Sequence, residues 1–329
     1  MQYIGRFAPT PTGPLHFGSL IAAVASYCDA KSNSGKWLLR MEDLDKPREV
    51  ADAADNILRS LEVFGFEWDA AILYQSQRNE IYEEYLHNLK RKGLIYACTC
   101  SRKEIADFSV ASGVDGAIYP KTCLNKMLEN LPSDFNAAAT ARVVPAEYTS
   151  LSWLFMRESR INACSWRINV DNAQKITFVD AIQGEISQNL PTQVGDFILK
   201  RKDGFFAYQL AVVVDDALQN ITHIVRGADL LDSTPRQIYL QNLLDFTLPH
   251  YAHVPVASNA AGEKLSKQTL AKPIDTGIAS HLIVEALSFL GQMPPLALKN
   301  ASLAECWHWA IKHWNLASVP RQEKIITNL

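Results

Sequence analysis

Residues 6–20, which read RFAPTPTGPLHFGSL, gather three prolines, two glycines and the donor side chains of His16 and Ser19. A short β-prone run precedes this stretch, and an apolar helix is predicted from Ser19 to Tyr27. A strand, a tight turn and a helix N-terminus present backbone N–H groups and a positive dipole end to phosphate. Gly13 and Gly18 lack a Cβ where a ligand must come close. The stretch therefore predicts a phosphate-binding corner, with an ordinary strand–helix turn as the alternative.

A second candidate for phosphate chemistry is the loop Lys264–Gln268, which reads KLSKQ and carries two lysines. Transfer at a nucleotide phosphate needs cations that meet the charge building on the leaving pyrophosphate. A solvated basic turn is the alternative interpretation of this loop.

The residues His16–Ser19 (HFGS) resemble the HIGH motif of class I aminoacyl-tRNA synthetases, and KLSKQ resembles their KMSKS loop. Three further segments are similar to the glutamyl branch of that family, in the same chain order: RMEDLD at 40–45, YQLAVVVDD at 208–216 and IVRG at 224–227. The resemblance covers residues 3–270. Within the branch the chain is most similar to truncated relatives, because it has a paired-cysteine insertion and lacks a large region after Gln268.

This resemblance implies ATP-dependent activation of L-glutamate to glutamyl-adenylate, and transfer of the glutamate to queuosine, the wobble nucleoside of tRNA(Asp). The implied partners are ATP, L-glutamate and a tRNA(Asp) anticodon stem-loop that carries queuosine. The segment after Gln268 is too short for a stem-contact bundle and an anticodon-reading domain. Two alternatives stay open: a minimal glutamyl-tRNA synthetase that charges a tRNA 3′ end, and a catalytically silent RNA-binding paralogue. The intact HFGS motif, Lys267 and Glu42 favour a catalyst.

The family's nucleotide site maps onto both motifs. The resemblance implies that His16 and Lys267 stabilise the activation transition state, with Mg²⁺ accompanying ATP. The implied ATP-binding residues are His16, Gly18, Ser19, Lys264 and Lys267. Ser19 replaces the second histidine of the HIGH motif, and Gln268 replaces the final serine of KMSKS. A helix cap is the alternative role of His16.

The same resemblance implies a site for glutamate. Arg6 is expected to pair with the side-chain carboxylate, with help from Arg226, because a guanidinium can hold a carboxylate through two parallel hydrogen bonds. Glu42 is expected to bind the α-ammonium group together with Thr10 and Tyr208, and Ala8 completes the implied set. The alternatives are a strand-edge charge for Arg6, a surface acid for Glu42 and a core aromatic for Tyr208.

One position departs from the full-length glutamyl enzymes, which commonly carry asparagine four residues after this tyrosine. Val212 occupies that place, so the resemblance alone does not establish tight glutamate binding without tRNA. Asp215 and Asp216 are predicted to follow a strand end, where they orient ligand groups or cap a loop.

Three cysteines are clustered in sequence. Cys98 and Cys100 are spaced i, i+2, which places both thiols on one face of an extended segment, and Cys123 follows. Three thiolates and one further donor complete a tetrahedral structural zinc site. The relatives use a tyrosine there, so Tyr119 is the expected fourth ligand, with Cys164 or water as competitors. The alternative is a set of reduced cysteines that pack a small subdomain.

Composition restricts how the chain can bind RNA. A net charge of −3 and a pI near 6.2 argue against a broad nucleic-acid-coating surface. RNA contact must then be local, and the candidates are Lys200–Lys202 and the segment from Arg157 to Arg160. The N-terminal sequence has no signal-peptide pattern, so a cytoplasmic monomer is expected.

Alternating strand and helix patterns must position these residues, and they predict an α/β fold with a Rossmann-type parallel sheet. Strands are expected at 36–41, 206–214 and 221–226, and helices at 47–61 and 79–92. We divide the chain into a first catalytic half (1–97), an insertion with a zinc-binding subdomain (98–192), a second catalytic half (193–262), and the KMSKS-like loop with a small helical C-terminal region (263–329).

Overall fold

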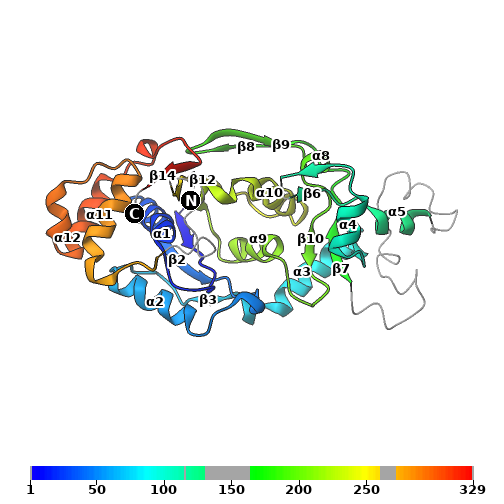
Figure 1. The fold of residues 1–329 in the computed structure, drawn as a ribbon, viewed down its shortest axis with the longest axis horizontal. Helices are drawn as coiled ribbons and strands as arrows, with labels where there is room; N and C mark the ends of the chain where they lie inside the picture. Colours follow the sequence, from blue (N-terminus) through cyan, green and yellow to red (C-terminus); the bar gives the residue numbers. More distant parts are fainter. Residues whose placement is uncertain (1, 115, 130–163, 260–271, 328–329) are drawn as a thin grey trace.

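The computed structural model describes residues 2–114, 116–129, 164–259 and 272–327, and it has an elongated shape (Figure 1). Two C-terminal helices, α11 (Ala279–Phe289) and α12 (Leu303–His313), lie at one end. The helices α4 (Arg102–Phe108) and α5 (Thr122–Glu129) lie at the other. Among the described residues, no helix combines the length and the apolar composition that crossing a membrane requires.

A parallel sheet with the strand order β1-β2-β3 occupies the part of the molecule next to the C-terminal helices. Its strands are β1 (Ile4–Phe7), β2 (Lys36–Met41) and β3 (Leu73–Tyr74). A second parallel pair is formed by β11 (His223–Gly227) and β12 (His250–Val254). Thr222 connects the two, because its N–H donates to the Ile4 carbonyl at 2.9 Å. The predicted parallel sheet is thus confirmed, and β1 and β11 lie side by side.

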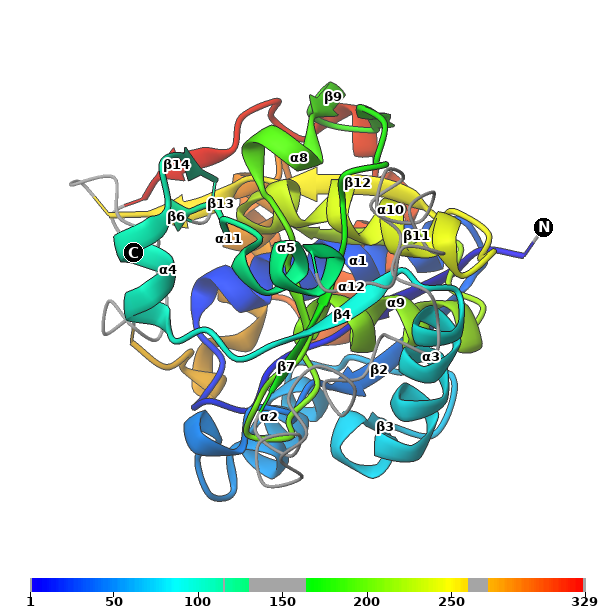
Figure 2. The ribbon, with the colours of Figure 1, turned by 90° about the vertical axis from the view of Figure 1, so that its right-hand side faces the viewer.

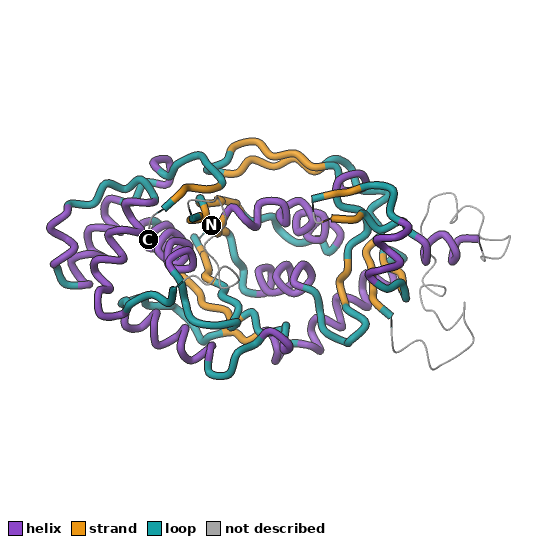
Figure 3. Tube along the Cα trace, viewed as in Figure 1, coloured by secondary structure: helices purple, strands orange, loops and turns teal. Residues whose placement is uncertain are grey.

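Helices cover these strands and link them (Figure 3). Buried α1 (Phe17–Ser32) packs on β1, β2 and β11, and α11 and α12 pack on α1. The other α-helices of the described ranges are α2 (Ala53–Val63), α3 (Asn79–Arg91), α8 (Leu190–Gln193), α9 (Tyr208–Leu218) and α10 (Thr234–Leu243).

Most of the other described strands build smaller antiparallel units toward the α4–α5 end, seen from that side in Figure 2. A sheet of order β10-β7-β4 combines β4 (Ile95–Cys98), β7 (Ser165–Ile168) and β10 (Ile198–Lys200). The hairpin β8–β9 (Ile176–Asp180, Gly184–Gln188) runs along one edge of the molecule. A short antiparallel pair is β5–β6 (Ser112–Gly113, Gly116–Ala117). The pair β13–β14 (Val256–Ser258, Lys324–Ile326) is instead parallel and lies nearer the C-terminal helices. The domain boundaries given above remain a prediction.

The predicted strand at 206–214 is wrong, because most of this segment belongs to helix α9, which runs from Tyr208 to Leu218. Its valine run has the β-branched composition of a buried strand. The low helix propensity of valine is only a weak preference, however, and burial on all sides overrides it. Val212, Val213 and Val214 are at most 1% exposed, so an apolar helix here is buried all round. Asp215 and Asp216 consequently lie within a helix rather than after a strand end.

Two predicted helices need smaller corrections. The segment expected to be helical from Pro47 has only a 3₁₀ turn at Lys46–Arg48, and α2 begins at Ala53, after Asp52 with φ of 59°. Val50 therefore lies outside the helix and is 50% exposed. Helix α3 buries Tyr82, Leu86 and Leu89 rather than the predicted set of Ile81, Tyr85 and Leu89.

Candidate active site

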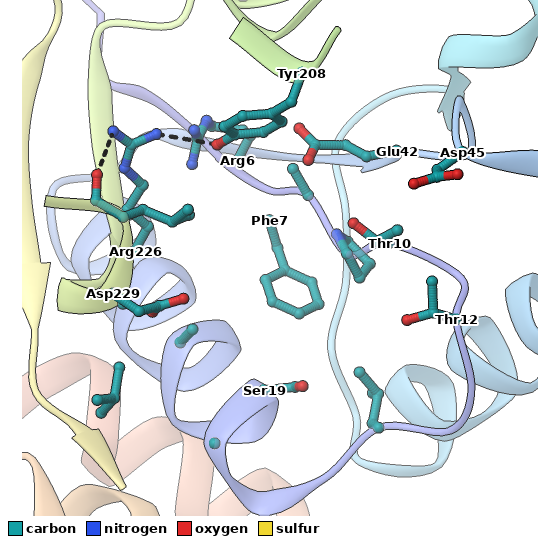
Figure 4. Close-up of a pocket in the computed structure, with 18 of the residues that line it drawn as sticks. Arg6, Phe7, Thr10, Thr12, Ser19, Glu42, Asp45, Tyr208, Arg226 and Asp229 are labelled. Carbon is teal, nitrogen blue, oxygen red and sulfur yellow. Dashed lines mark hydrogen bonds between the residues drawn. The ribbon is translucent and has the colours of Figure 1, made fainter. Parts of the chain in front are cut away.

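A cavity of about 720 Å³ opens where the carboxyl ends of β1, β2 and β11 meet the N-termini of α1 and α9. Ligands bind at this edge of open α/β sheets, because loops and helix N-termini converge there. The cavity brings together every described residue predicted to bind ATP or glutamate: Arg6, Ala8, Thr10, His16, Gly18, Ser19, Glu42, Tyr208 and Arg226 (Figure 4). Lys264 and Lys267 lie outside the described residues.

His16 caps the N-terminus of α1. Its Nδ1 accepts a hydrogen bond from the Ser19 backbone N–H at 3.3 Å, and its Nε2 lies 3.0 Å from Ser19 Oγ. Because Nδ1 accepts, the proton must lie on Nε2, which donates to the serine hydroxyl. The helix cap considered for His16 is therefore present, and the same ring lines the cavity.

Arg6 enters the cavity from β1 and is 4% exposed. Its Nε donates to Asp216 Oδ1 at 3.2 Å, and its Nη2 lies 3.5 Å from Asp216 Oδ2. Nη1 contacts no polar group of the described residues, and its two N–H groups can therefore donate to a ligand.

Arg40 is a buried residue at the start of the RMEDLD segment, and it is not among the predicted site residues. Its Nη1 donates to Asp216 Oδ1 at 2.8 Å and to Gln219 Oε1 at 2.9 Å, and its Nη2 lies 3.3 Å from Glu42 Oε1. Burial would raise the pKa of Asp216, but Arg40 and Arg6 hold it below the ordinary value. Asp216 is therefore a fixed anion that orders two guanidinium groups.

The electrostatics of Glu42 differ from those of Asp216. Burial raises the pKa of Glu42 above its ordinary value, and Arg40 and Arg6 offset this only in part. A buried carboxylate is stabilised when a further cation reaches it. Glu42 lines the cavity, so an ammonium group of a ligand can supply that charge.

Arg226 faces Arg6 and Glu42 from β11 (Figure 4). Its Nη1 donates to the Tyr208 hydroxyl at 3.3 Å, and its Nη2 donates to Thr234 Oγ1 at 2.8 Å. Burial raises the pKa of Tyr208, so this hydroxyl keeps its proton. Since the Tyr208 oxygen accepts from Arg226, its own O–H can donate to a ligand.

The remaining wall carries charged residues that the sequence prediction did not assign to the cavity: Asp45, Arg48, Arg201 and Asp229. Arg48 Nη2 lies 2.6 Å from Asp45 Oδ2, and Arg201 Nη1 lies 3.9 Å from Asp45 Oδ1. Arg201 belongs to the basic run Lys200–Lys202, which is the signal that the sequence offered for it.

Three positions considered in the sequence, Val212, Asp215 and Asp216, are absent from the cavity lining. Asp215 accepts hydrogen bonds from Gln75, Arg78 and Tyr82 on the other side of α9. Val212 is fully buried and is absent from the cavity lining. Consecutive residues of a helix point about 100° apart, which explains why Asp216 binds Arg6 and Asp215 does not.

Far from this cavity, at the α4–α5 end, the thiols of Cys98, Cys100 and Cys123 all lie within 4.8 Å of one another. The Tyr119 hydroxyl lies 3.3 Å from Cys98 Sγ and 3.6 Å from Cys100 Sγ, and Cys100 Sγ lies 3.5 Å from Cys123 Sγ. Ligands of a tetrahedral zinc ion with Zn–S bonds of about 2.3 Å are separated by about 3.5–3.8 Å. The four donors therefore fit a zinc ion, whereas Cys164 packs against Ala97 and lies outside the three-thiol group.

Comparison with known proteins agrees with this arrangement. The family model for tRNA synthetases class I (E and Q), catalytic domain, matches residues 4–282. The chain is 52% identical to a Glutamyl-Q tRNA(Asp) synthetase of Dechloromonas aromatica, and the match covers 98% of both chains. It is 50% identical to the protein of that name from Chromobacterium violaceum, over 97% of this chain and 95% of the relative.

A glutamate-tRNA synthetase crystal structure from Elizabethkingia anophelis shares the fold, with a TM-score of 0.73 and 24% identity. That match covers 99% of this chain and 68% of the solved one. The chain thus belongs to the class I tRNA synthetases of the glutamyl and glutaminyl type and, within them, to the family of the Glutamyl-Q tRNA(Asp) synthetases.

Proposed function

We propose that this protein activates L-glutamate with ATP and transfers the glutamyl group to queuosine in tRNA(Asp). The observation that carries the proposal is that Arg6, Arg226 and Glu42 line one cavity, beside the N-terminus of α1. Two guanidinium groups can bind the side-chain carboxylate of glutamate, and the Glu42 carboxylate can bind its ammonium group. The acceptor, queuosine in tRNA(Asp), is inferred from the name Glutamyl-Q tRNA(Asp) synthetase that the relatives carry.

Glutamate is placed by its charges. Its side-chain carboxylate accepts from Arg6 Nη1, from the remaining Nη1 N–H of Arg226 and from the Tyr208 hydroxyl. Its α-ammonium binds Glu42, with Thr10 and Ala8 at the same end of the cavity. Glutamine lacks the negative charge that two buried guanidinium groups require, so glutamate is favoured.

ATP lies across the N-terminus of α1, where His16, Gly18 and Ser19 line the cavity. An α-carboxylate oxygen of glutamate attacks the α-phosphorus, a new P–O bond forms, and pyrophosphate leaves. Mg²⁺ arrives with ATP and neutralises phosphate charge. Lys264 and Lys267 are proposed to meet the charge of the departing pyrophosphate, on the strength of their motif alone.

The acceptor enters from the wall formed by Asp45, Arg48 and Arg201. Queuosine carries a cyclopentene diol whose vicinal hydroxyls resemble those of a terminal ribose. One hydroxyl oxygen attacks the activated glutamyl carbonyl, an ester bond forms, and AMP leaves. An anticodon loop can present its wobble base unstacked, so the nucleoside can reach the cavity. We place this reaction in the cytoplasm and assign it to a monomer.

The zinc site is proposed to be structural, with Cys98, Cys100, Cys123 and Tyr119 as ligands. The Cys123 backbone N–H donates to the Tyr119 oxygen at 3.0 Å, and the Arg167 guanidinium lies 4.1 Å from the centre of the Tyr119 ring. Burial raises the pKa of the Tyr119 hydroxyl, and the Cys123 N–H opposes this in part, as a metal ion bound there would. In this position the ion would hold the loop between β4 and α5 together.

The test uses anticodon stem-loops of tRNA(Asp) that differ only in their wobble nucleoside. With ATP and labelled glutamate, the queuosine form should be glutamylated and the guanosine form should not, and nuclease digestion should place the label on the wobble nucleoside. Label on the 3′-terminal adenosine of tRNA(Glu) would favour a minimal glutamyl-tRNA synthetase instead. Absence of glutamate-dependent ATP–pyrophosphate exchange would favour a silent paralogue.

A further inference from the structure

Arg226 is held from behind by a pair of buried residues that do not line the cavity. Its Nε donates to His253 Nε2 at 3.0 Å, while Nη1 and Nη2 bind Tyr208 and Thr234. His253 lies on β12, which pairs with β11 so that Arg226 and His253 are opposite one another. The imidazole is fully buried and stacks 6.2 Å from the Tyr251 ring. Arg226 therefore has a fixed partner on the side away from the ligand.

Asp180 fixes the other side of the His253 ring. Its Oδ2 lies 2.6 Å from His253 Nδ1. Its Oδ1 accepts from the backbone N–H groups of Ile182, Gln183 and His253 at 3.0, 2.9 and 3.1 Å. Asp180 is 1% exposed, so these bonds are shielded from bulk solvent. The carboxylate is thus committed to the turn of the β8–β9 hairpin and to one imidazole nitrogen.

These contacts determine the tautomer of His253. The Arg226 Nε–H can only donate, so His253 Nε2 must accept, and the ring proton lies on Nδ1, where the Asp180 carboxylate accepts it. Burial lowers the pKa of His253 to about 4, which keeps the ring neutral at physiological pH. The other tautomer would direct an N–H at the Arg226 N–H.

We propose that Asp180 and His253 position Arg226, and that this buried pair sets the affinity of the cavity for the side-chain carboxylate of glutamate. The inference rests on the proposed function, in which Arg226 binds that carboxylate. Arg226 has one N–H for the ligand, so a small rotation of its guanidinium removes the contact. The Asp180–His253 pair prevents that rotation from the side of Arg226 that faces away from the ligand. A buried aspartate orients an imidazole in hydrolases in a similar way.

The first experiment replaces His253 and measures glutamate-dependent ATP–pyrophosphate exchange. His253→Leu should raise the KM for glutamate about 10–100-fold, because a displaced binding group costs this much, and should leave the KM for ATP within about twofold. His253→Gln should recover most of the loss, because its amide oxygen can accept from Arg226 and its amide nitrogen can donate to Asp180. Tyr239→Phe is the matched control, since it removes a buried hydrogen bond to the Asn169 carbonyl at 3.1 Å outside the cavity lining.

Asp180→Asn provides a second test that does not depend on a large change of shape. An asparagine amide nitrogen directed at His253 Nδ1 would donate to it, which demands the opposite tautomer. The ¹⁵N shifts of His253 should therefore change from those of the Nδ1–H form to those of the Nε2–H form. The KM for glutamate should rise at the same time. An unchanged glutamate KM in both His253→Leu and Asp180→Asn would overturn the positioning role, as would an equal rise in the KM for ATP. If the wild-type protein itself lacks exchange activity, the proposed function fails rather than the positioning role.

Discussion

The Arg6 guanidinium and the Asp216 carboxylate, which are 210 residues apart in the chain, form a buried ion pair with Nε 3.2 Å from Oδ1. Each side chain is 4% exposed. The pair connects β1 to α9, the two elements that contribute Arg6 and Tyr208 to the cavity. It also leaves Nη1 of Arg6, which has no hydrogen bond among the described residues, available to the cavity. One contact therefore serves both the packing of the fold and the geometry of the proposed glutamate site.

Asp216→Asn should strongly destabilise the protein. The change leaves Arg6 and Arg40 buried without their shared anion, and removing one partner of a buried ion pair costs about 3–5 kcal/mol. Urea unfolding measures this free energy. Asp245→Asn is the control, because its pair with Lys92 at 3.2 Å leaves the aspartate 86% exposed, and such pairs contribute less than about 1 kcal/mol. Equal losses in the two variants would contradict the importance of the buried pair.

Arg6→Ala should abolish most glutamate-dependent ATP–pyrophosphate exchange. A ligand carboxylate buried without its cation loses about 2–5 kcal/mol of binding. Arg6→Lys should lie between wild type and alanine, because an ammonium keeps the charge but not the planar fork. The exposed Arg59→Ala on α2 should behave as wild type. If Arg6→Ala still prefers glutamate to glutamine strongly, another residue recognises the side chain.

The sequence alone was sufficient to predict that the residues in contiguous motifs would meet at one site. Arg6 lies in β1, Glu42 directly follows β2, and His16 and Ser19 lie at the N-terminus of α1. Their neighbourhood is therefore encoded locally, and the structure brings them to one cavity. Their roles in binding remain predictions. Asp45 ends the RMEDLD motif and Arg48 follows it. Only the three-dimensional path of the loop after β2 shows that both side chains reach the cavity.

Long-range contacts could not be predicted in this way. No local pattern indicates that Arg40 bridges Glu42 and Asp216, or that His253 supports Arg226, because each contact depends on how distant elements pack. The same limit explains the error at α9. Its valines favour a strand locally, whereas the surrounding helices and strands bury it as a helix.

Metal analysis of protein purified without a chelator should give about one zinc per chain. Changing Cys98 and Cys100 together to serine should remove it and lower the thermal midpoint, because binding of a structural metal is coupled to folding. Cys164→Ser should retain the metal, since Cys164 lies outside the three-thiol group. Tyr119→Phe should weaken retention against a chelator. Stoichiometric zinc in the double variant would refute the assignment.

The stability of the protein should depend on pH through His253. Its pKa is lowered from 6.5 to about 4 in the fold, chiefly by burial, with the Arg226 charge acting in the same direction and Asp180 and Asp229 opposing. The unfolded chain therefore binds the proton more readily, so this stabilisation is complete above pH 6.5 and is lost as the pH falls toward 4.

The lowered pKa of His253 corresponds to a change of about 3 kcal/mol in the free energy of unfolding. Urea unfolding of wild type and His253→Gln between pH 7 and pH 4 isolates this contribution, because glutamine has no proton to gain while the other carboxylates titrate in both proteins. The comparison uses the slopes, because a constant shift of the whole curve by the substitution does not affect them. The wild-type free energy of unfolding should fall more steeply below pH 6.5 than that of the variant. Parallel curves would show that His253 is not kept neutral in the folded protein, and the tautomer required for holding Arg226 would lose its physical basis.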